Sequence, residues 1–295
     1  MNELITLRDG RKLQWADNGI VSDSALLFHH GTTCAKDCWD MWLQGAAEAG
    51  VRAISYNRPG VDQSTRFEGR RVSNDIEDSQ VLLAALGITK FVSVGWSGGG
   101  ARAMGTGLLE GCVGVHTIAG IAQINVDDPE TYIGLSDERM VQVRKNIASY
   151  AEVFKERKAG YEDDLKLTYE IAIKDLEGCP GFDQFEEDYK VFAQDFTNSI
   201  HKGLAQGPEI DADDFFANIN FWGYSVSEVN VPVTIWHGTN DDGVSIERGE
   251  YNHKHLPDST LIPLEGQNHV SIMVENRTEI LAAAINDLLG NTLEG

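Results

Sequence analysis

The chain has 295 residues, of which 42% are hydrophobic, and its 46 acidic and 24 basic residues give a formal net charge of -22 at pH 7. This hydrophobic content is enough for a sizeable core, which excludes a disordered protein, and the length suits one large domain or a core with an inserted cap. The negative charge repels phosphate backbones and anionic lipid headgroups, so we expect neither nucleic acid nor a membrane as partner.

The first predicted elements are two short strands joined by a tight turn. They cover residues 4–7 and 12–15, and the intervening Asp9-Gly10 is a strong hairpin signal. The sequence does not open on a basic stretch followed by an apolar core, and no run is long enough to span a bilayer. We therefore expect a cytoplasmic protein.

Short apolar runs alternate with longer amphipathic segments along most of the remaining chain. This alternation predicts an α/β protein with a mostly parallel central sheet and helices on both of its faces. Six further strands are predicted at residues 25–29, 52–56, 91–94, 113–118, 231–236 and 260–264.

The strand signal disappears between about Asp128 and Val229, where the sequence is helical in period and rich in charged residues, Phe and Tyr. We predict an inserted helical cap, or lid, over residues 128–229. The core domain would then consist of residues 1–127 and 230–295. Some of the aromatic side chains of the cap are candidates for the lining of a substrate pocket.

The strand predicted at residues 91–94 leads into a glycine-rich turn that contains Ser97. The pattern Gly95-Trp96-Ser97-Gly98-Gly99 suits a turn so tight that the residues two before and two after the serine must lack bulk. Ser97 would then be exposed at the end of a strand, where the N-terminus of the next helix favours negative charge. Taken alone, the pattern is also compatible with an ordinary strand-to-helix turn.

Two later loops offer the groups that a nucleophilic serine needs, a general base and an acid that orients the base. Asp241 follows the strand predicted at 231–236, and His269 follows the strand predicted at 260–264. Each alone could be an ordinary loop residue. The order Ser97, Asp241, His269, each just past a predicted strand, indicates a catalytic triad.

The loop after the strand at residues 25–29 is the candidate for stabilising an oxyanion. In His30-Gly31-Thr32, Gly31 permits a loop in which the backbone amide of Thr32 points at the substrate, and the amide of Gly98 would be the second donor. We assign His30 to the shape of this loop rather than to acid–base or metal chemistry.

These motifs together resemble a serine hydrolase of the α/β-hydrolase fold superfamily, and within it the esterase and proline-iminopeptidase-like branch. The resemblance extends along nearly the whole core, whereas the cap matches only in position. The segments that carry it are His30-Gly31, residues 57–64 (NRPGVDQS), residues 95–99, residues 237–241 (HGTND) with Val244, and residues 266–269 (GQNH).

Several positions depart from the family pattern. Asn57 and Asp62 replace an aspartate and a glycine, and Asn268 replaces a glycine, all at supporting positions. Thr33 stands where proline or glycine is common, which predicts an unusual shape for the oxyanion loop and the acyl pocket.

The acid of the triad has alternatives. Asp242 adjoins Asp241, and the register of the family motif favours Asp241. In some relatives the acid follows an earlier strand, which would make it Asp127 or Asp128.

The predicted function is a cofactor-independent hydrolase that cleaves a carboxylic ester, or an amide, through an acyl-enzyme. The same triad could serve C–C bond hydrolysis, hydroxynitrile cleavage, perhydrolysis or an aminopeptidase, for which Glu186, Glu187 and Asp188 could hold a substrate ammonium. A non-enzymatic alternative is a small-molecule-binding module with a vestigial site.

The partner predicted from charge and composition is a neutral or cationic, partly apolar small molecule. The sequence leaves a homo-oligomer open. The four cysteines do not have metal-binding spacing, so we expect no metal, and pairing of Cys34 with Cys38 on oxidation is left open.

Overall fold

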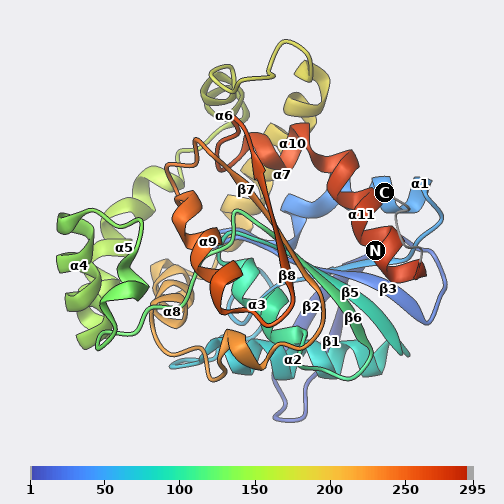
Figure 1. Ribbon diagram of the computed structural model, residues 1–295, viewed down its shortest axis with the longest axis horizontal. Helices are drawn as coiled ribbons and strands as arrows, with labels where there is room; N and C mark the ends of the chain where they lie inside the picture. Colours follow the sequence, from blue (N-terminus) through green and yellow to red (C-terminus); the bar gives the residue numbers. More distant parts are fainter. Residues whose placement is uncertain (1, 291–295) are drawn as a thin grey trace.

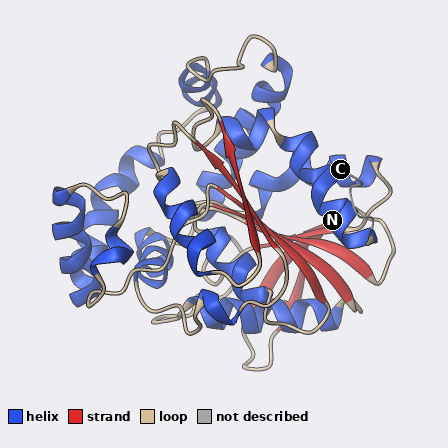
Figure 2. Ribbon diagram, in the orientation of Figure 1, coloured by secondary structure: helices blue, strands red, loops and turns tan. Residues whose placement is uncertain are grey.

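The computed structural model describes residues 2–290, in which eight strands form one sheet covered by helices (Figures 1 and 2). The strands are β1 (Asn2–Thr6), β2 (Lys12–Asp17), β3 (Ser24–His29), β4 (Ala53–Tyr56), β5 (Lys90–Trp96), β6 (Cys112–Ile118), β7 (Val233–Gly238) and β8 (Ser259–Leu264). The predicted hairpin is confirmed, because β1 pairs antiparallel with β2 and Gly10 adopts a φ of 89° in the turn between them.

The strand order is β1-β2-β4-β3-β5-β6-β7-β8. β2 runs antiparallel to β4, and every neighbouring pair from β4 to β8 is parallel. The predicted mostly parallel α/β fold is therefore confirmed. Since parallel strands end at the same edge of a sheet, the loops that follow β3, β5, β7 and β8 come together there.

Both faces of the central part of the sheet are buried, which explains why the central strands are mostly apolar. On β3, Ala25 and Leu27 pack into the core on one face and Leu26 and Phe28 into the core on the other, all fully buried. The helices on the first face are α2 (Val72–Ala85), α3 (Gly99–Thr106) and α9 (Ile246–His255), and those on the second are α1 (Asp40–Glu48) and α11 (Arg277–Leu289).

The chain between β6 and β7 contains helices and no strand, within the described residues. We call this stretch, residues 119–232, the insertion. Its helices are η2 (Pro129–Tyr132), α4 (Asp137–Ala148), α5 (Tyr150–Asp164), α6 (Tyr169–Leu176), α7 (Glu186–Gly203), α8 (Pro208–Ile219) and η3 (Val226–Glu228). They form two groups, α4 with α5 and α8, and α6 with α7 (Figure 1).

Two positions that depart from the family pattern adopt left-handed backbone. Asp62 has a φ of 48° and Thr33 a φ of 65°. Aspartate tolerates this region better than most residues, so Asp62 can take the place of a glycine. Asn57 donates to Gln14 and accepts from the backbone of Lys36, both at 2.7 Å, and so ties this loop to the core.

Two further observations bear on expectations from the sequence. Among residues 2–290, none of the helices has both the length and the apolar character needed to cross a membrane. Cys34 and Cys38 are buried free thiols, as are Cys112 and Cys179.

Candidate active site

Ser97 lies at the sharp turn between β5 and α3. Its φ is 54°, a left-handed conformation that is unusual for a residue with a side chain, and its backbone N–H donates to Ile118 O at 2.9 Å. A Cβ on Gly95 would lie 2.3 Å from the carbonyl oxygen of Gly99, and one on Gly99 would lie 2.1 Å from that of His29. The structure therefore places both glycines where a side chain would collide with backbone.

Replacing Gly99 by alanine is expected to destabilise the protein by at least about 1–3 kcal/mol, because the neighbouring backbone of β3 must move. Chemical denaturation of the variant measures the loss. Gly160→Ala, in α5, is the control. The new Cβ would lie 3.8 Å from Asp164, an ordinary contact, so this variant should be at least as stable as the wild type. Equal stability of Gly99→Ala and the wild type would contradict this account of the turn.

Asp241 and His269 come together at the carboxyl ends of β7 and β8. His269 Nδ1 lies 2.8 Å from Asp241 Oδ2, while Asp241 Oδ1 accepts from the amides of Gly243 and Val244 at 2.9 and 2.8 Å. The Asp241 side chain is fully buried, whereas that of His269 is 20% exposed. These contacts hold the imidazole in one orientation. The proton is then on Nδ1, and Nε2 is free to accept another proton.

Among residues 2–290, none of the alternative acids forms a hydrogen bond or ion pair with His269. Asp242 is exposed and lines a cavity, and its neighbour Asp241 holds the imidazole. Asp127 is exposed, and Asp128 caps η2 by accepting from the amide of Glu130 at 3.0 Å.

Ser97 and His269 line one cavity. Within the described chain no hydrogen bond joins their side chains, and such bonds are often long in unliganded enzymes and shorten when substrate binds. Trp96 contacts the histidine in two ways. Its Nε1 donates to His269 O at 3.0 Å, and the centroids of the two rings lie 5.3 Å apart.

The orientation of the Thr32 amide is fixed by the carbonyl of the same peptide. Gly31 O accepts from Arg58 and from Nδ1 of His30, both at 2.8 Å. Because the C=O and N–H of a trans peptide point in opposite directions, the Thr32 N–H points away from Arg58.

The Gly98 amide is oriented in the same way. Ser97 O accepts from Gly100 N at 3.0 Å and from Ile121 N at 3.3 Å, which directs the Gly98 N–H to the opposite side. A Cβ on Gly98 would lie 3.4 Å from Thr32 N, so the two amides are neighbours beside the serine.

His30 supports this loop as a neutral side chain. Its Nε2 accepts from the backbone N–H of Arg58 at 3.2 Å, so the proton must be on Nδ1, which donates to Gly31 O. Burial, together with the Arg58 charge, keeps the pKa of His30 well below its ordinary value. The predicted loop-shaping role of His30 matches these contacts.

A cluster of buried charges connects this loop, α3 and α8. Its five side chains, each at most 5% exposed, are Arg58, Arg70, Arg102, Asp75 and Asp214. Asp214 of α8 pairs with Arg58 at 2.7 Å and with Arg102 at 3.2 Å, and Arg102 pairs with Asp75 at 2.9 Å. The cluster anchors α8 of the insertion to the residues around the serine.

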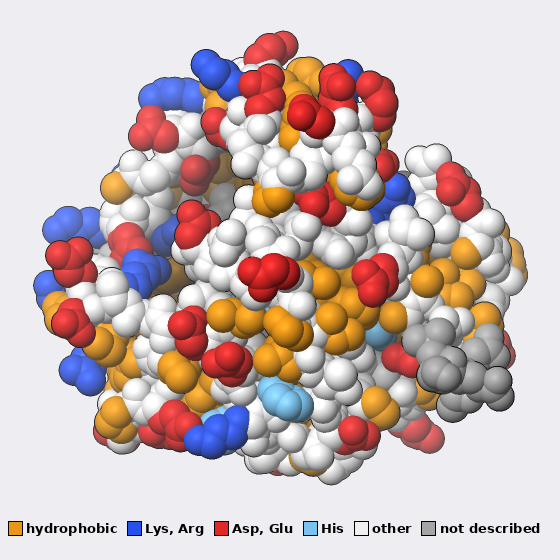
Figure 3. All heavy atoms as spheres, turned by 45° about the horizontal axis from the view of Figure 1, so that its top comes forward, with side chains coloured by type: hydrophobic (Ala, Val, Ile, Leu, Met, Phe, Trp, Pro, Cys, Tyr) orange, Lys and Arg blue, Asp and Glu red, His pale blue; other side chains and the backbone are white. Residues whose placement is uncertain are grey.

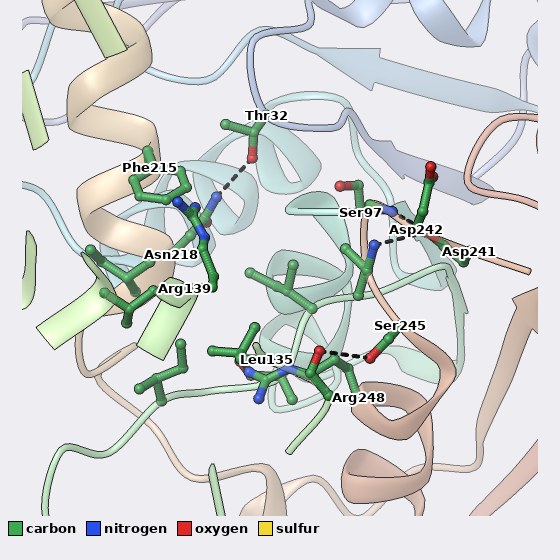
Figure 4. Close-up of a pocket in the computed structure, with 18 of the residues that line it drawn as sticks. Thr32, Ser97, Leu135, Arg139, Phe215, Asn218, Asp241, Asp242, Ser245 and Arg248 are labelled. Carbon is green, nitrogen blue, oxygen red and sulfur yellow. Dashed lines mark hydrogen bonds between the residues drawn. The ribbon is translucent and has the colours of Figure 1, made fainter. Parts of the chain in front are cut away.

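Asn218 of α8 contacts Thr32 directly and is linked to Gly98 through Arg102, and Thr32 and Gly98 are the two candidate oxyanion residues. Its Nδ2 donates to Thr32 Oγ1 at 2.8 Å (Figure 4). Its Oδ1 accepts from Arg102, which itself donates to Gly98 O at 2.9 Å. A residue of α8, far from both in the sequence, thus helps to fix the position of Thr32 and, through Arg102, that of Gly98.

Asp214→Asn is expected to lower the free energy of unfolding by about 3–5 kcal/mol, because it leaves buried guanidinium groups without their carboxylate. Burial alone would raise the pKa of Asp214, but the surrounding guanidinium groups hold it well below the ordinary value of 3.8. The wild type should therefore keep this stabilisation above about pH 4 and lose it as the pH falls further.

Denaturant unfolding of both proteins at neutral and acidic pH measures this difference. Asp213→Asn is the matched control, because the partner of Asp213 is Arg66, which is one-third exposed. A loss for Asp214→Asn no greater than for Asp213→Asn would contradict the role of the cluster.

Two cavities with different walls meet at the candidate triad. The larger, of about 650 Å³, lies between the core and the group α4, α5 and α8, and its wall includes Ser97 and Thr32 (Figure 4). The smaller, of about 220 Å³, has a mostly apolar wall that includes His269, Leu176 and Phe196. Figure 3 shows the surface hollowed between the two helix groups, with acidic side chains spread over the same face.

Sequence reasoning missed several residues around the site. Asp214 and Asn218 are four positions apart on α8, a spacing that puts them on one helix face, but nothing local points that face at the oxyanion loop. Of the cap aromatics, Phe215 lines the larger cavity and Phe196 the smaller one, and the sequence does not show which of them face a cavity.

A mostly parallel eight-stranded sheet with a strained serine in the turn after its fifth strand is the arrangement of the α/β-hydrolase fold. The chain belongs to the alpha/beta hydrolase family, whose model matches residues 26–284.

Solved structures share this fold at low sequence identity. An esterase from Exiguobacterium antarcticum superposes with a TM-score of 0.68 at 16% identity, over 98% of this chain and 100% of that one. The bromoperoxidase from Bacillus anthracis superposes with a TM-score of 0.64 at 21% identity, over 98% of this chain and 100% of the bromoperoxidase. The enol-lactonase from Burkholderia xenovorans superposes with a TM-score of 0.64 at 12% identity, over 97% of this chain and 100% of the enol-lactonase.

Proposed function

We propose that this chain is a serine hydrolase that cleaves carboxylic esters of small molecules, in the manner of the esterase-like branch of its family. The observation that carries the proposal is the contact of His269 Nδ1 with the buried carboxylate of Asp241, at 2.8 Å, in a protein whose strained Ser97 lines the same cavity as His269. A buried carboxylate, an imidazole and an exposed hydroxyl are the groups that acyl transfer needs.

In the proposed acylation step, Ser97 Oγ attacks the ester carbonyl carbon and passes its proton to His269 Nε2. Asp241 keeps the Nδ1 proton in place and stabilises the imidazolium that forms. The amides of Thr32 and Gly98 donate to the oxyanion, each worth about 3 kcal/mol. The tetrahedral intermediate collapses when His269 protonates the leaving alcohol, and an acyl-Ser97 ester remains.

In the proposed deacylation step, His269 takes a proton from water as the water attacks the acyl-enzyme. The second tetrahedral intermediate releases the acid and returns the proton to Ser97 Oγ. No step requires a cofactor. Residues 128–229 would act as the cap that closes over the substrate, since α8 lies against the oxyanion loop.

The ester is favoured over a peptide with a free amino terminus. Glu186 and Glu187, which could have held a substrate ammonium, pair with Lys190 and have side chains that are 53% and 87% exposed. Asp188 pairs with Arg277 at 3.0 Å. Their charges are directed to neighbouring lysine and arginine side chains rather than to a substrate.

Labelling by a fluorophosphonate tests the proposal, because the reagent forms a stable phosphonyl ester only with an activated serine. We expect one phosphonyl group per chain, located on the peptide that contains Ser97, and no labelling of Ser97→Ala. Labelling of the wild type should compete with a p-nitrophenyl ester substrate. A wild-type protein that neither reacts nor turns over short esters, yet binds a small molecule tightly, would instead be a binding module.

A further inference from the structure

Arg248 carries a buried positive charge beside the larger cavity. It lies in the first turn of α9, is 4% exposed and lines this cavity. Its guanidinium group donates to the backbone carbonyls of Thr131, Ile133 and Ala122, which are neutral acceptors. These three bonds leave two of its five N–H donors, the number used in a bidentate contact with a carboxylate.

The other arginines of the cavity wall differ in having acidic partners. Arg139 pairs with Glu156 at 2.8 Å and Arg157 with Asp211 at 2.5 Å. Arg248 forms no ion pair within residues 2–290, and burial lowers its pKa to about 10, so it remains charged at neutral pH. A buried charge without a counter-ion is energetically unfavourable, and an anionic ligand would offset this cost.

The cavity of Arg248 is the one that suits the acyl group. His269 must protonate the leaving alcohol, so we place the alcohol on the His269 side, in the cavity that Ser97 and His269 share and in the smaller, apolar cavity whose wall also includes His269. The acyl group then occupies the larger cavity, whose wall includes Ser97 and Thr32. Figure 4 places Arg248 along the side of this cavity opposite Thr32 and Asn218, where the far end of an acyl chain would lie.

Acidic groups near the cavity do not neutralise Arg248. Asp241 has its oxygens committed to His269 and to the amides of Gly243 and Val244. Asp242 lines the cavity wall but is exposed to solvent, which screens its charge. The net charge of the whole chain favours neutral or cationic substrates at long range, whereas the interior of the cavity favours one negative group.

We propose that the substrates are monoesters of dicarboxylic acids, whose free carboxylate binds Arg248 while Ser97 attacks the ester at the other end of the acyl chain. This inference rests on the proposed hydrolase function. It deepens that function by naming the acid half of the ester.

The test compares monoethyl with diethyl esters of the same dicarboxylic acids, from succinate to sebacate, with acid release followed by titration. Each pair shares one acyl chain and differs in whether its far end is charged. For the chain length that spans the cavity, we expect wild-type kcat/KM to favour the monoester by about 10- to 100-fold, the worth of a hydrogen-bonded carboxylate–guanidinium contact.

Arg248→Gln should abolish this preference while it still hydrolyses the diethyl esters, and Arg248→Lys should keep part of it. Arg144→Gln is the charge-matched control, because Arg144 lies in α4, is exposed and stacks on Tyr132. It should keep the full preference.

A measurement on the wild type alone covers the case in which Arg248→Gln fails to fold. Free dicarboxylates should inhibit diethyl ester hydrolysis competitively and more strongly than their uncharged diamides, because only the dicarboxylates offer Arg248 a counter-ion. Hydrolysis of diethyl esters with no preference for monoesters and no inhibition by dicarboxylates would overturn the inference and leave the proposed function standing. Absence of all ester hydrolysis and of fluorophosphonate labelling would overturn both.

Discussion

Replacing Ser97 by alanine is expected to lower kcat for ester hydrolysis by about 10⁴-fold or more, because the variant has no nucleophile and can offer only the oxyanion donors to an attacking water. Alanine keeps the Cβ and fits the same left-handed turn, and Ser97 makes its turn contacts through backbone atoms. The fold should therefore survive, and the loss should appear in kcat.

Steady-state kinetics on a p-nitrophenyl ester measures this loss, and thermal unfolding verifies that the variant is folded. Ser149→Ala is the control, since Ser149 lies at the junction of α4 and α5, away from Ser97. A folded Ser97→Ala protein that turns over the ester at the wild-type rate would rule out Ser97 as the nucleophile.

Asp241→Asn should have a similarly large effect, a fall in kcat of about 10⁴-fold. An amide NH₂ in place of Oδ2 would donate to His269 Nδ1 and leave the proton on Nε2, so the imidazole could no longer accept the serine proton. The other oxygen can still accept from Gly243 and Val244, which should preserve the loop. Measured rates over a range of pH would show the loss.

Asp242→Asn is the matched control for Asp241→Asn, because it removes the same charge one position along the chain. Asp242 is exposed and Asp241 makes the contact with His269, so the loss at Asp242 should be far smaller. If Asp242→Asn were as damaging as Asp241→Asn, or if Asp127→Asn or Asp128→Asn were, the geometry-based choice of the acid would be wrong.

The order and approximate bounds of the strands followed from local patterns. The runs around Leu26, Val92 and Ile235 are mostly apolar because both faces of each strand are covered, and this can be recognised without knowing the partner strands. Gly95 and Gly99 could likewise be recognised from the sequence, because the turn leaves no room for a side chain at either position.

The sequence was less informative wherever side chains from distant segments meet. Asp241 and Asp242 are chemically identical neighbours, and only the path of the loop after β7 directs one of them to His269. The sequence shows that Asp62 replaces a glycine of the family pattern, but only the structure shows that the aspartate adopts left-handed backbone there.

The sequence by itself determined the fold class, the turn that exposes Ser97 and the loops that deliver Asp241 and His269, because each depends on residues close together in the chain. The tertiary structure alone decided that Asn218 contacts Thr32 and Arg102, and that Arg248 lines a cavity with no acidic partner among residues 2–290. Such contacts depend on how the insertion packs on the sheet, and charge pairing between distant segments leaves no periodic signal in the sequence.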